Sequence, residues 1–561
     1  NVKTAKMICE CECAVQEDKA RDTATRLFAK DATLWSENAE TQAKILNRLG
    51  WLDAPEAMLS LAPQVIEVVD RVRAAGFTTA VLLGMGGSSL CPEVMSKVFG
   101  TAKDYLKLMV LDSTAPESVA AIDNAVELEK TLFIPASKSG STIETNVMYA
   151  YYYDRLLKAG VENPGRHFVA ITDPGSSMEK LAAEKSFLHC FLNPPQIGGR
   201  FSALSLFGLF PMALLGINIE EMLMRVNEVS SQSSEFVRNA MSLGLRLGTA
   251  AQKGRNKLTF QMSPKFKPLG DWIEQLVAES TGKNGKGILP VVGEKNGAQS
   301  DDRIYVQMSV GTEATPECCG CTKSPRIEIK LDDLLDIGCE FYRWELMTAA
   351  MGVALEENPF DEPNVTESKQ NTMALLNSYS EKGELPLPEF CGKFGELIRV
   401  SPTAALHDAV AAKEGVAPAC PLGLAEALRM LTSTVNTGDY VTLSAFVAPT
   451  AERLVALQSI RGALGVKTGC PTTLGIGPRF LHSTGQLHKG GPNQGVYLVI
   501  ATVANAATDL TIPGYPYSFG TLCLAQGLGD FSSLDRHGRR AMLLLVDDVD
   551  KALAYIADSL K

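Results

Sequence analysis

Two short polar stretches of the sequence have the residue types that bind an anion. "LLGMGGSS" (82–89) and "PASKSGST" (135–142) each follow an apolar run and precede a helical pattern. Small residues let the backbone approach a ligand closely, and the free N–H groups at a helix start carry partial positive charge, so a phosphate suits such a turn. The hydroxyls that can add hydrogen bonds belong to Ser88, Ser137, Ser139, Ser141 and Thr142, and Gly87 and Lys138 lie in the same turns.

The alternative for these two stretches is a pair of ordinary helix caps, because Ser and Thr are common capping residues. Neither stretch has the lysine spacing of a P-loop, and "GMGGSS" does not satisfy the GxGxxG pattern of dinucleotide sites. These differences disfavour nucleotide hydrolysis and dinucleotide binding.

A parallel sheet is the element expected to position the two stretches. Between residues 66 and 215, short apolar runs alternate with helical patterns, as in a parallel sheet covered by helices on both faces. In such sheets the loops at the carboxyl ends of the strands face the ligand crevice. The predicted strands are 78–85, 105–113, 131–137, 167–173 and 188–193.

The same alternation of apolar runs and helical patterns recurs twice further along the chain, which indicates several domains. A chain of 561 residues is also too long for one core, since a single core stops growing at roughly 250–300 residues. Runs at 256–263, 286–292, 303–310 and 326–331 predict a second α/β domain, and runs at 440–447, 495–502 and 541–548 predict a third, smaller one. We place a helical N-terminal segment at 1–65, α/β domains at 66–230 and 231–376, and a C-terminal α/β extension at 377–561 that begins with a linker at 377–389.

Composition excludes several classes of protein. The net charge of −11 disfavours a nucleic-acid or anionic-membrane surface. The most apolar stretch, 201–219, is interrupted by polar residues and a proline, so it predicts a buried helix rather than a membrane span. Thirteen scattered cysteines and no signal peptide indicate the cytoplasm, and the chain begins with Asn1, which leaves open that it is a piece of a longer protein.

The clustered cysteines raise the question of a metal site. Neither cluster has the paired spacing or the nearby histidine of a zinc site, so we interpret both as incidental or structural thiols and expect no metal. The clusters are Cys9, Cys11 and Cys13, and Cys318, Cys319 and Cys321.

Five stretches in this order resemble the phosphoglucose isomerase family, which is built from two sugar-isomerase (SIS) domains. They are "GMGGSSL" (84–90), "SKSGSTIET" (137–145), "GGRFS" (198–202), "LVAESTGKNGKGI" (276–288) and "NPFDEPNVTESK" (358–369). "AKDATLW" (29–35) and the tail "GIGPRFLHSTGQLHKGGPNQG" (475–495) are more specifically similar to the isomerase half of bifunctional transaldolase/phosphoglucose isomerase fusions. The resemblance implies two doubly wound SIS-type parallel-sheet domains, a hexose phosphate as partner, no cofactor, and reversible conversion of glucose 6-phosphate into fructose 6-phosphate through an enediol(ate).

The resemblance also implies roles for three residues that the sequence alone would leave as a surface glutamate, a structural arginine and an exposed lysine. Glu279 matches the base that moves the proton between C2 and C1, a task for a positioned carboxylate. Arg200 matches the cation beside the enediolate oxygens, and Lys369 matches the lysine that assists ring opening. Ser88, Ser137, Ser139 and Thr142 match the phosphate loops.

Three features depart from the family pattern. Glu362 stands where many members have glutamine, so a carboxylate would repel the substrate phosphate unless it is turned aside or protonated. The ring-opening histidine expected between the base and the lysine is missing, because no histidine lies between His189 and His407. A transaldolase half, which needs a (β/α)₈ barrel of about 250 residues, does not fit into this sequence, so a transaldolase is expected only as a fused or separate partner.

The tail offers two histidines for the missing role. His482 and His488 lie in a glycine-rich stretch, and a histidine titrates near neutral pH. We expect one of them, with preference for His488, to reach the active site and open the ring. The alternatives are a structural latch between domains and, less favoured, a metal ligand.

Two other functions stay open at this point. One is a related isomerase acting on mannose 6-phosphate, and the other is a non-catalytic SIS sensor of sugar phosphates. The sensor is disfavoured because the chain is acidic, shows no basic recognition helix and keeps Glu279. The oligomeric state stays open between monomer and homodimer.

Overall fold

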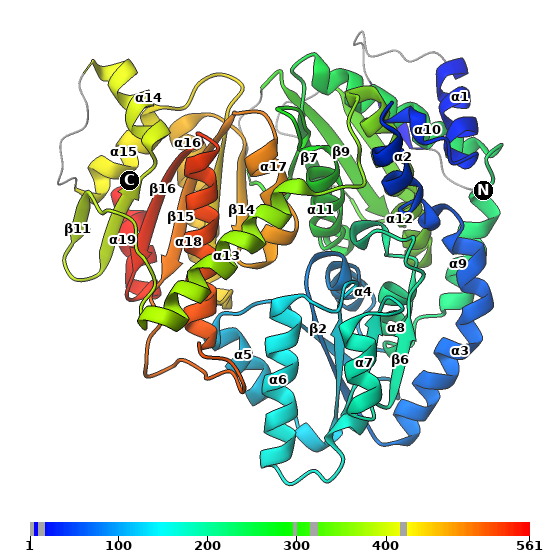
Figure 1. Cartoon of the computed structure of the whole chain (residues 1–561). Coiled ribbons are helices and arrows are strands. Elements are labelled where there is room, and N and C mark those ends of the chain that lie inside the picture. The colour runs from blue at the N-terminus through cyan, green and yellow to red at the C-terminus, as the bar shows by residue number, and fades with distance from the viewer. Residues whose placement is uncertain (1–4, 9–16, 296–299, 315–323, 416–422) are drawn as a thin grey trace.

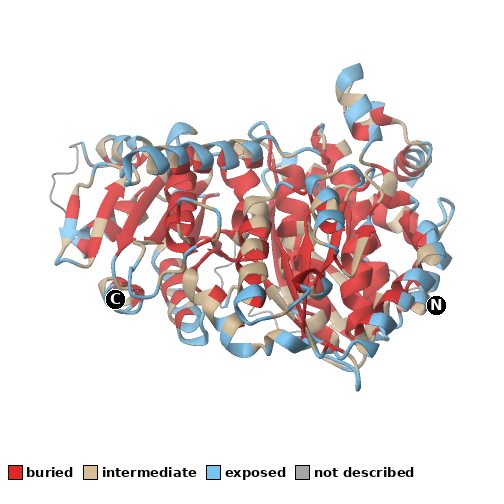
Figure 2. Ribbon diagram, turned by 60° about the horizontal axis from the view of Figure 1, so that its bottom comes forward, coloured by how far each residue is buried: buried red, intermediate tan, exposed pale blue. Residues whose placement is uncertain are grey.

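The computed structural model describes residues 5–8, 17–295, 300–314, 324–415 and 423–561, and it contains three sheets, each covered by helices (Figure 1). Both cysteine clusters lie outside the described residues. Figure 2 shows that the strands are buried, whereas the outer turns of the covering helices carry the exposed residues. The α/β class predicted from the apolar runs is confirmed.

The first unit is built on a five-stranded, fully parallel sheet in the order β3-β2-β4-β5-β6. Each of the five strands coincides with a predicted apolar run: β2 (Thr79–Gly84), β3 (Lys107–Leu111), β4 (Thr131–Ala136), β5 (Val169–Thr172) and β6 (His189–Leu192). Its helices are α4 (Leu90–Phe99), α5 (Pro116–Ala125), α6 (Ile143–Lys158), α7 (Ser177–Glu184) and α8 (Leu206–Leu214). Every residue of α8 is buried, as expected for the apolar stretch 201–219. Among the described residues, no helix has the length and apolar composition to cross a membrane.

The second unit has a sheet in the order β1-β10-β9-β7-β8. Four strands match the predicted runs and pair in parallel: β7 (Lys257–Met262), β8 (Leu289–Val291), β9 (Arg303–Val310) and β10 (Arg326–Leu331). The covering helices are α9 (Ile219–Val229), α10 (Glu235–Gln252), α11 (Leu269–Thr281) and α12 (Ile337–Leu355). The fifth strand, β1 (Lys6–Ile8), pairs antiparallel with β10. It comes from the N-terminal segment that the sequence predicts as helical, because three edge residues carry no periodic signal.

The rest of the N-terminal segment is helical, as predicted, and joins the core of the first two units. It forms α1 (Glu17–Phe28), α2 (Ala39–Leu46) and α3 (Ala54–Ala74). Helix α3 runs across the boundary that the sequence places at residue 65. The division of the chain into domains remains a proposal.

The C-terminal unit has a six-stranded sheet in the order β11-β12-β16-β15-β13-β14. β13 (Tyr440–Phe446), β15 (Gly495–Thr502) and β16 (Arg540–Val546) match predicted runs, whereas β11 (Gly392–Phe394), β12 (Ile398–Pro402) and β14 (Thr472–Ile476) are short and have no predicted counterpart. Its helices are α14 (Ala404–Glu414), α15 (Leu424–Ser433), α16 (Ala451–Thr468), α17 (Gly485–Gly490), α18 (Phe519–Arg536) and α19 (Val549–Ser559).

Helix α13 (Pro363–Lys382) connects the second unit to the C-terminal unit and packs against α18 (Figure 1). The predicted linker at 377–389 is therefore wrong in its first half, which continues this helix to Lys382. The sequence "NSYSEK" is polar because one side of the helix faces solvent.

Candidate active site

Adjacent strands bring the two predicted anion-binding turns next to each other. β2 and β4 pair in parallel, so the turn after Gly84 and the turn after Ala136 leave the same edge of the sheet. In the second turn, Ser137 Oγ lies 2.9 Å from Thr142 Oγ1, and Ser139 Oγ lies 2.9 Å from Ser141 Oγ. No described side chain caps the start of α6, so its first N–H groups remain available to a ligand.

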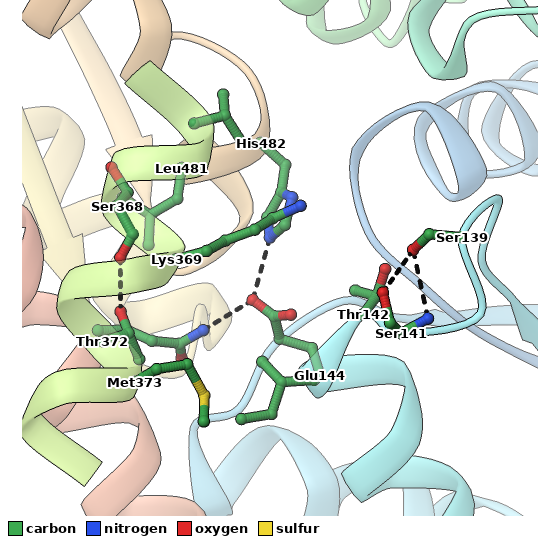
Figure 3. Close-up of a pocket in the computed structure, with 13 residues that line it drawn as sticks. Ser139, Ser141, Thr142, Glu144, Ser368, Lys369, Thr372, Met373, Leu481 and His482 are labelled. Atoms are coloured by element: carbon green, nitrogen blue, oxygen red, sulfur yellow. Dashed lines mark hydrogen bonds and ion pairs between the residues drawn. The ribbon is translucent and has the colours of Figure 1, made fainter. Parts of the chain in front are cut away.

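A cavity of about 130 Å³ opens beside this turn (Figure 3). Four separate parts of the chain form its wall: the turn and first residues of α6, the first half of α13, the short helix η9 (Arg479–His482), and α18 of the C-terminal unit. The lining residues are Ser139, Ser141, Thr142, Ile143, Glu144, Val365, Ser368, Lys369, Thr372, Met373, Leu481, His482 and Gln526. The structure thus brings Ser139, Ser141, Thr142, Lys369 and His482 together from the set predicted by sequence.

His482 is held in this cavity by a buried carboxylate. Its Nε2 lies 3.0 Å from Glu144 Oε1, and Gln526 donates to the same oxygen at 2.8 Å. Burial alone would raise the pKa of Glu144, but His482 and Lys369 hold that pKa below its ordinary value. Figure 3 shows Lys369 extending from α13 toward this pair. The carboxylate fixes the ring orientation and leaves Nδ1 free to exchange a proton.

Glu279, on α11, lies next to the His482 backbone rather than in the cavity wall. Gln275 Nε2 donates both to Glu279 Oε2 at 3.0 Å and to the His482 carbonyl oxygen at 2.6 Å. Glu279 is buried, and burial raises its pKa above the ordinary value even though Arg200 Nη1 lies 3.5 Å from Oε1. A carboxylate with a raised pKa is suited to accept and return a proton.

Arg200 fixes the loop that contains Glu362. Its Nη1 lies 2.8 Å from Glu362 Oε2, its Nε donates to Ser280 Oγ at 2.8 Å, and its Nη2 donates to the carbonyl oxygens of Pro359 and Asp361. Although burial alone would raise the pKa of Glu362, Arg200 lowers it, so this carboxylate is ionised and neutralised by the guanidinium. Of the two arrangements expected for Glu362, turned aside or protonated, the structure has the first.

Several predicted phosphate-binding residues do not line the cavity. Lys138 forms an ion pair with Asp173 and donates to the Pro195 carbonyl oxygen at 2.7 Å, so its side chain points away from the turn. Ser88 also lies outside the cavity lining, and Ser137 is buried behind the turn.

Gly87 has a packing role. A Cβ at Gly87 would lie 2.0 Å from the Gly199 carbonyl oxygen, so only glycine lets η3 (Gly86–Ser88) pack against η6 (Gly199–Phe201), which carries Arg200.

The structure reverses the preference between the two histidines. His488 is 1% exposed and packs against the rings of Phe480 and Tyr497 instead of lining the cavity. Burial, with nearby Lys489 and Arg539, lowers the pKa of His488 well below its ordinary value. A neutral, enclosed imidazole cannot deliver a proton to a ligand in the cavity, whereas His482 faces it.

Sequence reasoning missed Glu144, Gln275 and Gln526. Glu144 lies within the stretch "SKSGSTIET", in the first turn of a helix, where an acidic residue is common without any special task. Gln275 precedes Glu279 by one helical turn, which is the only local sign that the two side chains meet. No local pattern indicates Gln526.

Comparison with known proteins finds the family that the sequence motifs resemble. Residues 65–286 match the family model described as Phosphoglucose isomerase. A glucose-6-phosphate isomerase of Thermus thermophilus is 31% identical over 259 residues, which cover 44% of this chain and 60% of that protein. One from Rubrobacter xylanophilus is 28% identical over 370 residues, which cover 55% of this chain and 85% of that protein.

A solved structure shares the fold. The crystal structure of a hypothetical protein from Thermus thermophilus aligns with a TM-score of 0.52 and 24% identity, covering 64% of this chain and 94% of that one. The region matched by the family model ends before the sheet of the C-terminal unit begins. Residues 65–286 are thus similar to the phosphoglucose isomerase family, and the chain spans about 60% of the length of the Thermus thermophilus relative that it matches.

Proposed function

We propose that the protein is an aldose–ketose isomerase that interconverts glucose 6-phosphate and fructose 6-phosphate. Curated relatives that share 25–31% identity are named glucose-6-phosphate isomerases. The observation that carries the proposal is the convergence of three distant segments: Ser139, Lys369 and His482 line one cavity, and Gln275 joins the His482 backbone to Glu279.

The phosphate of the substrate is bound by the turn at 137–142. Its two exposed hydroxyls, Ser139 and Ser141, and the open N–H groups of α6 supply donors, while the helix supplies partial positive charge. Anchoring one end of the sugar phosphate places C1 and C2 toward Glu279. Holding the reacting atoms in this geometry lowers the free-energy barrier of the reaction.

Ring opening is assigned to His482. The imidazolium gives a proton to the ring oxygen as the bond from this oxygen to C1 breaks, and Glu144 stabilises the positive charge that the imidazole holds before transfer. Lys369, on the cavity wall, adds positive charge beside the same oxygen.

Isomerisation follows on the open chain. Glu279 removes the proton from C2, and electrons move toward the C1 carbonyl oxygen to give an enediol(ate). The same carboxyl group returns the proton to C1 while the hydroxyl proton of O2 passes to O1, which leaves the carbonyl on C2. The guanidinium of Arg200 lies beside Glu279 and stabilises negative charge on the intermediate. All of these groups come from one chain, so we propose that a single copy contains a complete site.

The test is exchange of the substrate C2 hydrogen with solvent deuterium, followed by mass spectrometry. Wild-type protein exchanges this hydrogen with glucose 6-phosphate, and Glu279→Gln loses exchange about 10²- to 10⁴-fold. Glu274→Gln, on the same helix but outside the cavity lining, is the matched control and retains exchange.

Other outcomes assign a different function. Exchange that persists in Glu279→Gln means that another group is the base. Turnover of mannose 6-phosphate instead of glucose 6-phosphate identifies the related isomerase, and binding without any exchange identifies a sugar-phosphate sensor.

A further inference from the structure

Helix η9, which ends at His482, contains a half-buried arginine that pairs with two carboxylates of the first unit. Arg479 Nη1 lies 2.7 Å from Glu93 Oε2 on α4, and its Nε lies 2.6 Å from Asp112 Oδ2, just beyond β3. Nη2 also donates to Asp112 Oδ1 at 3.0 Å. Two carboxylates thus accept hydrogen bonds from three nitrogen atoms of one planar guanidinium. This geometry fixes both the position and the orientation of the Arg479 side chain.

The same short helix is tied to the second unit at its other end. Gln275 of α11 donates to the His482 carbonyl oxygen at 2.6 Å. Arg479 and His482 are one turn apart, so a shift at the arginine moves the imidazole away from Glu144.

A cavity of about 400 Å³ lies beside η9 on the side of the arginine, lined by Glu93, Asp112 and Arg479 together with Asp271 and Glu274 of α11. Phe480 and Leu481 anchor η9 in the core of the C-terminal unit, whereas the ion pairs of Arg479 fix it relative to α4 and β3 of the first unit. Burial would raise the pKa of Glu93, but Arg479 and Lys97 lower it to about 2, so the Glu93–Arg479 pair stays ionised across the working pH range.

We propose that Arg479 is a positioning residue for ring opening: it pins η9 to the first unit and thereby holds the His482 imidazole at the cavity. This inference rests on the proposed isomerase function. Arg479 touches no part of the substrate cavity beside the 137–142 turn, so it acts only through His482.

The test compares a ring-forming substrate with one that cannot cyclise. Arg479→Ala is assayed on glucose 6-phosphate and on its 4,5-dideoxy analogue, which lacks both hydroxyls that close a sugar ring. Misplacing a catalytic group by about 1 Å costs roughly 10²-fold, so we expect a 10- to 100-fold loss of kcat on glucose 6-phosphate and less than about 3-fold on the analogue.

A matched control exists at the same interface. Arg453 on α16 pairs with Glu117 of the first unit at 3.1 Å and with Asp550 at 2.8 Å, but it lies far from His482 in the chain. Arg453→Ala removes an equivalent ion pair between the same two units, and we expect less than about 3-fold loss on both substrates.

A second variant controls for misfolding, because Arg479→Ala leaves the buried Asp112 and the partly buried Glu93 without their partner. The triple variant Glu93→Gln, Asp112→Asn, Arg479→Met removes all three charges, and circular dichroism checks its fold. A folded variant that loses activity equally on both substrates, or on neither, overturns the inference while leaving the isomerase intact. Wild-type protein that turns over neither substrate overturns the proposed function and the inference together.

Discussion

His482 of η9 and Glu144 of α6 form a contact of 3.0 Å between Nε2 and Oε1, although 338 positions separate them in the sequence. The contact joins the C-terminal unit to the first unit at the cavity that also contains Lys369 and the hydroxyl turn. The histidine that we propose for ring opening thus lies at the cavity, in a place that the order of residues does not suggest.

The two tail histidines give opposite phenotypes on substitution. His482→Ala loses about 10²-fold or more of kcat on glucose 6-phosphate, because the proton donor is gone, and keeps its melting temperature within a few degrees. His488→Ala keeps kcat but is less stable by about 2 kcal/mol or more, because it leaves a void between Phe480 and Tyr497. Steady-state kinetics and thermal unfolding separate the two, and the reverse pattern would contradict our assignment.

The phosphate turn is tested by removing hydroxyls. The double variant Ser139→Ala, Ser141→Ala loses two hydrogen bonds to a charged group, each contributing about 1.5–3 kcal/mol, so KM for glucose 6-phosphate rises at least 10-fold. Ser88→Ala serves as control, because Ser88 matches the family's phosphate loop in sequence but does not line the cavity. A larger effect from Ser88→Ala than from the double variant would place the phosphate elsewhere.

Glu274 makes stability depend on pH in a definite direction. Burial, followed by the nearby Asp271, raises the pKa of Glu274 to about 8, above the ordinary value of 4.5. The folded protein therefore holds this proton more tightly than the unfolded chain, and the stabilisation is lost as pH rises from about 4.5 through 8. Glu274→Gln has no proton to lose at this position and so lacks this pH-dependent loss of stability. The difference in melting temperature, variant minus wild type, is therefore larger at pH 8.5 than at pH 5. A gain that is equal at both pH values would show that Glu274 titrates normally.

Gly87 is required by close backbone packing. Gly87→Ala places a Cβ against the Gly199 carbonyl oxygen, pushes η3 away from η6 and disturbs Arg200, so we expect a loss of about 1–3 kcal/mol in the free energy of unfolding and a lower kcat. Gly199→Ala is the matched control. Apart from the two adjacent residues, no described atom would lie within 4 Å of a Cβ at Gly199. Chemical denaturation measures both, and equal stability of the two variants would refute the packing argument.

Much of the fold could be predicted from local patterns. The central strands of the first and C-terminal sheets are mostly apolar runs, since a strand covered by helices on both faces favours apolar residues along its length. The strands that were missed, β1, β11, β12 and β14, are short, and all four lie at or next to a sheet edge, where alternation over a few residues does not stand out.

By itself the sequence determined where the hydroxyl turns lie, because glycines, hydroxyls and apolar strands leave local signatures, and its resemblance to a family indicated Glu279, Arg200 and Lys369. Only the tertiary structure decided that His482 rather than His488 faces the cavity, that Glu362 pairs with Arg200, and that Lys138 turns toward Asp173. Each of these side-chain orientations depends on a partner residue from a distant segment of the chain. No local sequence pattern specifies which partner a side chain will contact.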